Sequence, residues 1–312
     1  MAAFAVRKNK EISLIKIKRC AGLYLLVFPA IILSFCFAYL PMYGVIIAFK
    51  DYRNALGILG SPFSDPVFRH FERFFNSFQF SLVIKNTITI SFYHMLATVP
   101  LPIIMALILN QMKSKVFKKT FQTISYMPHF ISTVVMVGII LIMLSPGSGL
   151  IGHLFRLFGK TAPNLMGMPE AFSSVYVWTD VWQHTGWDSI IYLAALSAID
   201  PALYEAAIVD GANRWQRMWR IDFPMLLPTA CILLILRAGN IMNIGFEKIY
   251  LMQNPLNRSA SEVISTYVYQ TGIINAQYSY SAAVGLFNTV INLALLLTVN
   301  FISKKLNETA LW

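Results

Sequence analysis

Residues 21–49 form a continuous run without a single charged side chain. A hydrocarbon layer about 30 Å thick is crossed by roughly 20 apolar residues in a helix, so this run can span a bilayer. Five similar segments follow, interrupted only by Asp180, Asp188 and Arg237, at residues 86–112, 121–144, 172–198, 225–246 and 281–303. Irregular backbone cannot face lipid, and the alternating pattern of a barrel is missing. We therefore expect an all-α integral membrane protein with six transmembrane helices.

The composition supports this class. Only 12% of the residues are charged and 57% are hydrophobic, whereas a soluble domain is about a quarter charged. Cys20, Cys36 and Cys231 lie in or beside apolar runs without CxxC spacing, so we expect neither disulfides nor a metal site. The first apolar run is too long for a signal peptide and lacks a small-x-small cleavage pattern, so we expect it to be retained.

The orientation follows from Lys and Arg in the connections, because cytoplasmic loops carry the excess of both. The two termini and the connections on their side hold fifteen of these residues, whereas the alternate connections hold eight. We expect both termini in the cytoplasm and the chain in the cytoplasmic (inner) membrane. The net charge of +11 thus reflects sidedness, and nucleic acid is not an expected partner.

A charged island, EAAIVDGANRWQRMWRIDFP, occupies residues 205–224 and holds six charges. Six charges inside the bilayer would cost on the order of 15–20 kcal/mol, so the island is a cytoplasmic loop. Asp200 is the expected N-cap of a first short helix, with Pro201 at its first position, and Gly211 is its expected stop. A second short helix is expected from Asn213, with Trp215, Met218 and Trp219 on one face. Spacing alone leaves open an ordinary solvated loop with interfacial tryptophans.

The spacing of Glu205-Ala206-Ala207, Gly211, Ile221 and Phe223-Pro224 resembles the EAA loop of ATP-binding-cassette importer permeases, which usually have Leu at the position of Phe223. Further segments are similar to the oligosaccharide and polysaccharide branch of these permeases, at residues 37–52, 125–135, 186–207, 237–255 and 280–293. The resemblance covers residues 20–303.

This resemblance implies a type I permease fold and one half of a pore formed with a second permease as a pseudo-symmetric heterodimer. It also implies two cytoplasmic ATPase subunits that carry ATP and Mg, an extracytoplasmic solute-binding protein, and a carbohydrate substrate. This chain would bind no cofactor itself and would contact lipid. The expected organisation is a basic segment 1–20, a first helix with its outer loop at 21–80, a transmembrane domain 81–303 with the EAA loop at 200–224, and a tail 304–312. The expected ATPase-coupling residues are Glu205, Ala206, Ala207, Asp210, Gly211 and Arg214.

Other functional classes fit the sequence less well. The GKT at 159–161 would need a glycine at position 154 to complete a Walker A loop, and that position holds leucine. A hydrolytic set of Asp180, His184 and Ser189 fails because Ser189 points away from the other two and no glycine-framed nucleophile is present, so no catalytic residue is expected.

An ion-coupled transporter usually has two related halves with paired acids. Here both membrane acids lie on one predicted helix.

The sugar path is expected where polar side chains lie at membrane depth, because such groups tend to face a wet cavity. Amides and carboxylates bind sugar hydroxyls, and a cationic Arg237 would suit acidic uronate-type substrates. The alternative is that Arg237 and Asp188 simply neutralise each other. The candidate residues are His184, Trp187 and Asp188 on the fourth span, Arg237, Asn240 and Asn243 on the fifth, and Asn288 and Asn292 on the sixth.

Overall fold

The structure, a computed structural model, describes residues 21–307. It divides into two compact units, with the boundary between Arg69 and His70. The expected basic segment 1–20, including Cys20, and residues 308–312 of the expected tail lie outside the described residues. The described part is helical, with one isolated bridge between Lys50 and Phe63 in place of any strand.

The first unit contains the first predicted span and the loop that follows it. Helix α2 (Ala21–Ser34) continues through a π-helical turn (Phe35–Tyr39) into a 3₁₀ segment (Leu40–Phe49), and together they form an apolar helix over Gly22–Phe49. The loop folds back onto the end of this helix, since Ser64 N–H donates to the Phe49 carbonyl over 3.0 Å. A short helix, α3 (Gly57–Gly60), lies within the loop.

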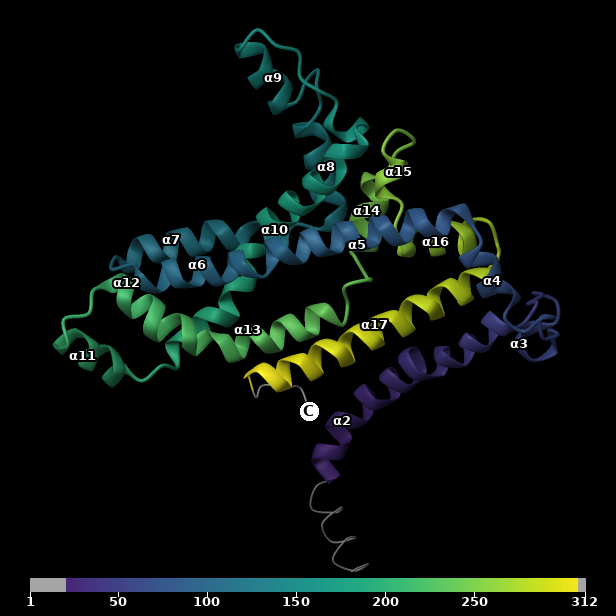
Figure 1. Cartoon of the computed structure of the whole chain (residues 1–312), viewed down its shortest axis with the longest axis horizontal. Helices are drawn as coiled ribbons and strands as arrows, with labels where there is room; N and C mark the ends of the chain where they lie inside the picture. Colours follow the sequence, from purple (N-terminus) through teal and green to yellow (C-terminus); the bar gives the residue numbers. More distant parts are fainter. Residues whose placement is uncertain (1–20, 308–312) are drawn as a thin grey trace, which may run out of the picture. The chain divides into compact units, whose positions relative to one another are not determined.

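The second unit holds the remaining spans (Figure 1). Its helices of seven or more residues are α4 (Arg69–Phe75), α5 (Phe78–Thr98), α6 (Pro100–Gln111), α7 (Lys115–Tyr126), α8 (Thr133–Met143), α9 (Leu150–Leu157), α10 (Pro169–Ser197), α11 (Pro201–Val209), α13 (Phe223–Ala238), α14 (Phe246–Met252) and α17 (Tyr278–Asn307). Shorter pieces are α12 (Arg214–Arg217), α15 (Arg258–Ser261), α16 (Ile264–Tyr269), 3₁₀ turns at Met127–Phe130 and Leu165–Gly167, and π-helical turns at Met218–Asp222 and Gln270–Ile274.

Four helices of the described chain are long and apolar enough to cross a membrane, and two bent helix pairs bring the number to six if each pair is one span. The four are Gly22–Phe49, Phe78–Gln111, Arg214–Ala238 and Tyr278–Lys305. The six-span prediction therefore agrees with the structure, but two of the predicted spans differ in shape.

The third predicted span, 121–144, is bent rather than straight. Helix α7 with its 3₁₀ extension meets α8 at 101°. Ile131 is extended, and Ser132 caps the new helix by accepting from Val135 N–H. Pro128 lacks an N–H group and therefore interrupts the hydrogen bonding just before this bend.

The fifth predicted span, 225–246, has different ends. Its helix begins at Arg214 and ends at Ala238, so the second helix of the charged island is the start of this span and not a separate short helix. Beyond Ala238 the chain turns irregularly as far as Gly245. Glycine is a weak helix former, and Asn292 Oδ1 accepts the N–H of Met242 in place of a helix carbonyl.

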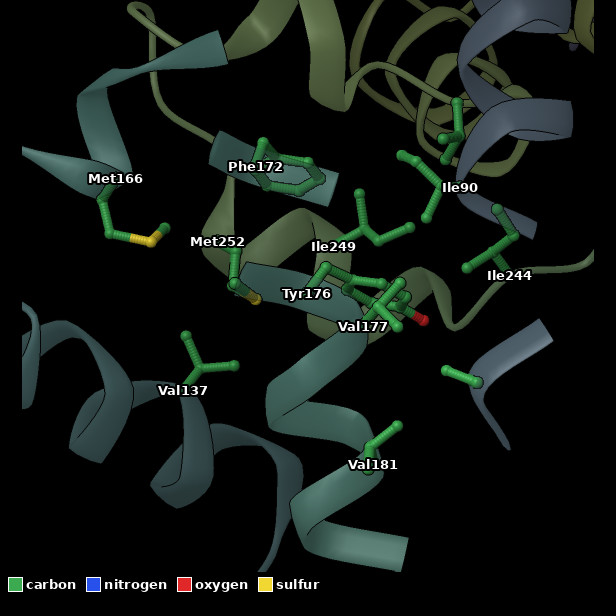
Figure 2. Close-up of a cluster of buried hydrophobic side chains, with 12 residues drawn as sticks. Ile90, Val137, Met166, Phe172, Tyr176, Val177, Val181, Ile244, Ile249 and Met252 are labelled. Carbon is green, nitrogen blue, oxygen red and sulfur yellow. The ribbon is translucent and has the colours of Figure 1, made fainter. Parts of the chain in front are cut away.

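Helix α10 is the central element of this unit. It packs against α5, α6, α7 and α13, while α13 lies along α17. One buried cluster gathers Phe172, Tyr176, Val177 and Val181 of α10 around Ile249 of α14, as Figure 2 shows. The crossing with α7 is close, because a Cβ at Gly186 would come within 2.1 Å of the Ser125 carbonyl oxygen. Only glycine fits there.

Candidate functional site

A polar cavity of about 370 Å³ opens between α5, α10 and the end of α13. This volume lies within the range of small-molecule sites. Its polar and charged lining residues are Ser91, His94, Thr98, Tyr176, Asp180, His184, Asp188, Arg237, Asn240 and Asn243. Five of the predicted path residues therefore line one cavity: His184, Asp188, Arg237, Asn240 and Asn243.

The irregular segment 239–245 forms one wall of this cavity. Asn240 and Asn243 lie on this turn and not on a helix face, contrary to the prediction, because α13 has already ended. Backbone without helical hydrogen bonds is tolerated at membrane depth only where protein or a cavity receives its polar groups. Here Asn288 of α17 donates to Asn243 Oδ1 over 2.7 Å.

Asn288 and Asn292 support the wall and do not line the cavity. Both side chains are buried, and both reach the turn from α17: Asn288 through Asn243, and Asn292 through the backbone of Met242. The two residues are one helical turn apart and therefore share one face of α17. That face contacts the turn.

Trp187 also lies outside the cavity lining. Its ring stacks on His129, with centroids 4.5 Å apart and planes within 4°. His129 in turn shares a 3.0 Å hydrogen bond with His184. Trp187 therefore contacts a cavity residue through His129, at the bend between α7 and α8.

Asp180 links three elements around the cavity. Its carboxylate accepts from His94 Nε2 of α5 over 2.7 Å and from Lys248 Nζ of α14 over 3.0 Å, and His184 lies 3.8 Å away. The side chains of Asp180 and Lys248 are only 14% and 5% exposed. A buried charge pair of this kind needs further hydrogen bonds to offset the loss of hydration, and His94 supplies one.

Sequence reasoning missed Lys248 and His94. Lys248 follows an apolar run in the sequence, so it reads as a cation of an outer connection. The sequence does carry one signal, because the spacing of Lys248, Ile249 and Met252 places them on one face of a short helix. The structure buries all three. The lysine therefore lies on the apolar side of α14.

Arg237 and Asp188 form an ion pair of 2.5 Å on the cavity wall. Arg237 also donates to the hydroxyl of Thr98 over 2.7 Å and to its carbonyl over 3.3 Å. That carbonyl is available because the residue four positions on is Pro102, which has no N–H to donate. The pair is 35% and 28% exposed, so the two sequence alternatives coexist: the charges are paired and they line the cavity.

The charged island has the local structure that the sequence predicts for its first half. Asp200 accepts from Ala202 N–H over 2.9 Å, and Gly211 has a φ of +77°, where a side chain would be strained. Asn213 and Gln216 form a reciprocal capping box. Helices α10 and α11 meet at 72°. The exposed residues of the predicted coupling set are Glu205, Ala206, Asp210, Gly211 and Arg214, and Ala207 is half-buried.

Large apolar side chains are exposed on the island as well. Val209 is 86% and Trp215 is 70% exposed. A loop with such exposed groups has an apolar surface available to a partner. Among residues 21–307 no cluster of His, Cys, Asp or Glu could hold a metal ion.

The family model described as "Binding-protein-dependent transport system inner membrane component" matches residues 98–308. The chain belongs to this family. It is 40% identical over 99% of its length to the polygalacturonan/rhamnogalacturonan transport system permease protein YteP of Bacillus subtilis, covering 95% of that protein. It is also 40% identical to protein LplB of the same organism, over 95% of this chain and 92% of that one.

Similar solved structures support the same family assignment. A bacterial ABC transporter involved in import of the acidic polysaccharide alginate superposes with a TM-score of 0.85, at 40% identity over 94% of this chain and 98% of that one. The same kind of transporter in complex with an alginate pentasaccharide-bound periplasmic protein gives a TM-score of 0.86 at 40% identity, over 95% of this chain and 98% of that chain.

The chain is thus a multi-pass inner-membrane permease subunit of a binding-protein-dependent ABC importer, with the type I fold. It is a transport subunit and not an enzyme. Family membership confirms the resemblance drawn from the EAA spacing and gives no support to an ion-coupled carrier.

Proposed function

We propose that this permease imports an acidic oligosaccharide or polysaccharide by alternating access, with the polar cavity as its passage. The observation that carries the proposal is the pairing of Arg237 with Asp188 on the cavity wall, where both side chains stay partly exposed. Relatives at 40% identity are named for polygalacturonan/rhamnogalacturonan transport and for import of the acidic polysaccharide alginate.

The pair can exchange one carboxylate for another. A guanidinium has five N–H donors, and three contacts to Asp188 and Thr98 engage Arg237, so donors remain for a ligand. A substrate carboxylate could take the place of Asp188, which accepts from one guanidinium nitrogen, and could engage the guanidinium bidentately. Asn243, held by Asn288 through its oxygen, keeps its amide N–H groups for sugar hydroxyls. Asn240 is exposed on the same wall.

The remaining partners follow from the family. A second permease would complete the passage as a pseudo-symmetric heterodimer, and two cytoplasmic ATPase subunits would bind ATP and Mg. An extracytoplasmic binding protein would deliver the substrate. Both termini would lie in the cytoplasm, as the distribution of Lys and Arg predicts. Lipid would cover the outer faces of the spans.

The charged island would dock into the ATPase. Glu205 and Ala206 are exposed on α11, Asp210 is exposed at its C-cap, and Arg214 is exposed across the Gly211 turn. The small side chains of Ala206 and Ala207 permit close approach, and Glu205 offers a carboxylate to a basic group. Because α12 continues directly into α13, a push on this loop is carried into a membrane-spanning helix.

Transport by Arg237→Gln measures the substrate class. In proteoliposomes with the assembled transporter, uptake of uronate oligomers should fall by about tenfold or more, the loss of one charge-assisted hydrogen bond, while neutral oligomers of equal length lose less. Arg258→Gln is the matched control, because Arg258 is half exposed and pairs with Glu262 away from the cavity. Equal losses for acidic and neutral oligomers would exclude carboxylate recognition by Arg237.

A further inference from the structure

Asp222 is a fully buried carboxylate at the base of the charged island. It ends the π-helical turn Met218–Asp222, between α12 and α13. No cation lies within ion-pair distance of it in the part of the chain that the structure describes. A buried charge without a counter-ion is costly unless hydrogen bonds replace its hydration.

Hydrogen bonds to Asp222 come from two other elements. Tyr204 of α11 donates its hydroxyl to Oδ1 over 2.6 Å. Gln111, the last residue of α6, donates its amide to Oδ2 over 2.7 Å, and Asn110 adds a longer contact of 3.4 Å. Burial and the neighbouring carboxylate raise the pKa of Tyr204, so its phenol keeps the proton that it donates.

These contacts join α6 to α11 and to the start of α13, whereas the chain connects α6 directly to neither. Helix α11 is covalently linked to α10 and, through Gly211, to α12. Two kinds of contact link it to α6: the hydrogen bonds of Asp222, and the packing of Tyr204 against the apolar cluster that holds Ala106 and Leu107. Helix α6 is the continuation of α5 in one apolar span, Phe78–Gln111. Asp222 itself directly precedes α13, which carries Arg237.

Both helices held by Asp222 carry walls of the polar cavity. His94 and Thr98 lie on the span that ends at Gln111, and Arg237 lies on the helix that follows Asp222. A displacement of α11 would therefore reach two sides of the cavity together. Without the Asp222 contacts, the loop could move and leave these two cavity walls in place.

We infer that Asp222 is a positioning residue that couples movement of the charged island to the two cavity walls, by fixing Tyr204 and Gln111 to the start of α13. The inference rests on the proposed docking of this loop to the ATPase. It assigns Asp222 no contact with substrate or nucleotide. Its effect is on how much transport each ATP hydrolysis produces.

The test uses the complete transporter in proteoliposomes with substrate-loaded binding protein. Tyr204→Phe removes one hydrogen bond and leaves the ring in place, and Asp222→Asn places an amide N–H₂ against the donors. In complexes that retain the ATPase, we expect basal hydrolysis to continue, while substrate uptake per ATP falls by about tenfold in Asp222→Asn and less in Tyr204→Phe. Tyr250→Phe is the control, since Tyr250 is partly exposed and lies on α14.

A double variant separates coupling from a general loss of structure. If Tyr204 acts through Asp222, then Tyr204→Phe combined with Asp222→Asn should be no worse in uptake per ATP than Asp222→Asn alone. Wild-type uptake per ATP in assembled Tyr204→Phe and Asp222→Asn transporters would overturn the inference. If Asp222→Asn does not assemble, Tyr204→Phe decides by itself.

The inference and the docking proposal fail separately. Glu205→Lys probes docking, because it reverses an exposed charge on α11 and leaves the hydrogen bonds of Asp222 intact. If Glu205→Lys releases the ATPase while Tyr204→Phe keeps normal uptake per ATP, docking stands and the role of Asp222 is wrong. If Glu205→Lys retains the ATPase and full activity, the docking proposal itself is wrong.

Discussion

Replacing Asp180 by asparagine removes the carboxylate that holds Lys248 and His94 together. Lys248, whose side chain is 5% exposed, would then lose its carboxylate partner and retain the ring contact to Tyr176 at 5.2 Å, so its charged form would be strongly disfavoured. Breaking a buried ion pair by removing one partner costs about 3–5 kcal/mol, because the other charge stays buried without compensation. We expect Asp180→Asn to destabilise the protein by an amount in this range.

Removing the other partner, in Lys248→Met, should cost less stability. In Lys248→Met the carboxylate of Asp180 still accepts from His94 over 2.7 Å and is 14% exposed, so it is only partly uncompensated. A loss of about 1–3 kcal/mol is the scale for one hydrogen bond to a buried charged group. The double variant, Asp180→Asn with Lys248→Met, removes both charges. It should be more stable than Asp180→Asn alone.

The assay is the temperature at which half of the purified transporter remains monodisperse after heating, read by size-exclusion chromatography. At roughly 2 °C per kcal/mol for a chain of this size, Asp180→Asn should lower this temperature by about 6–10 °C. Arg69→Gln is the control, since its ion pair with Asp51 is exposed on both sides, at 49% and 30%, and such pairs contribute about 0–1 kcal/mol. An Asp180→Asn midpoint within about 1 °C of wild type, or a double variant less stable than both single variants, would refute the reasoning.

Further predictions concern the charged island and the orientation of the chain. Glu205→Lys should weaken co-purification of the ATPase subunits by placing like charge against a basic site, while insertion in the membrane continues; co-purification equal to wild type would contradict docking. Gly211→Val should reduce uptake without any clash, because space is open around Gly211 but its φ of +77° strains a β-branched residue by about 1–2 kcal/mol. Cysteine labelling from outside should reach positions in 53–70 and 255–275 and should not reach 113–119 or 213–218. Labelling of 213–218 from outside would contradict the predicted orientation.

The sequence predicts the helical spans because length and hydropathy alone determine what can cross a bilayer. It also predicts the local caps of the charged island, since Asp200, Pro201, Gly211 and Asn213 each act within about one helical turn of their own position. These features are local. A single sequence is sufficient to read them.

The breaks within spans are harder to predict. Residues 121–144 and 225–246 are both apolar enough for straight helices, yet α8 departs from α7 by 101° and α13 ends at Ala238. What ends α13 is partly a contact from far away, the Asn292 oxygen that takes the N–H of Met242. Periodicity within a window cannot contain a partner 50 residues distant.

Charge partners are lost for the same reason. Asp188 and Arg237 are recognisable as a pair because both lie in apolar runs, where a lone charge demands an explanation. Lys248 lies just beyond an apolar run, so it reads as an ordinary loop cation. Asp222 reads as one charge among six in a hydrophilic loop, and only its complete burial separates it from Asp210.

The end of α13 and the polar cavity have one physical cause. A helix continued to residue 246 would satisfy its own backbone, and the turn that forms the cavity wall would not exist. The observed turn instead exposes Asn240 and Asn243 and gives α14 a new direction, which brings Lys248 to Asp180. Irregular backbone at this depth is costly in lipid, and here its polar groups meet amides of α17 or the cavity. The cavity, the two ion pairs and the buried asparagines of α17 are therefore parts of one arrangement, and removing the turn would remove the site with it.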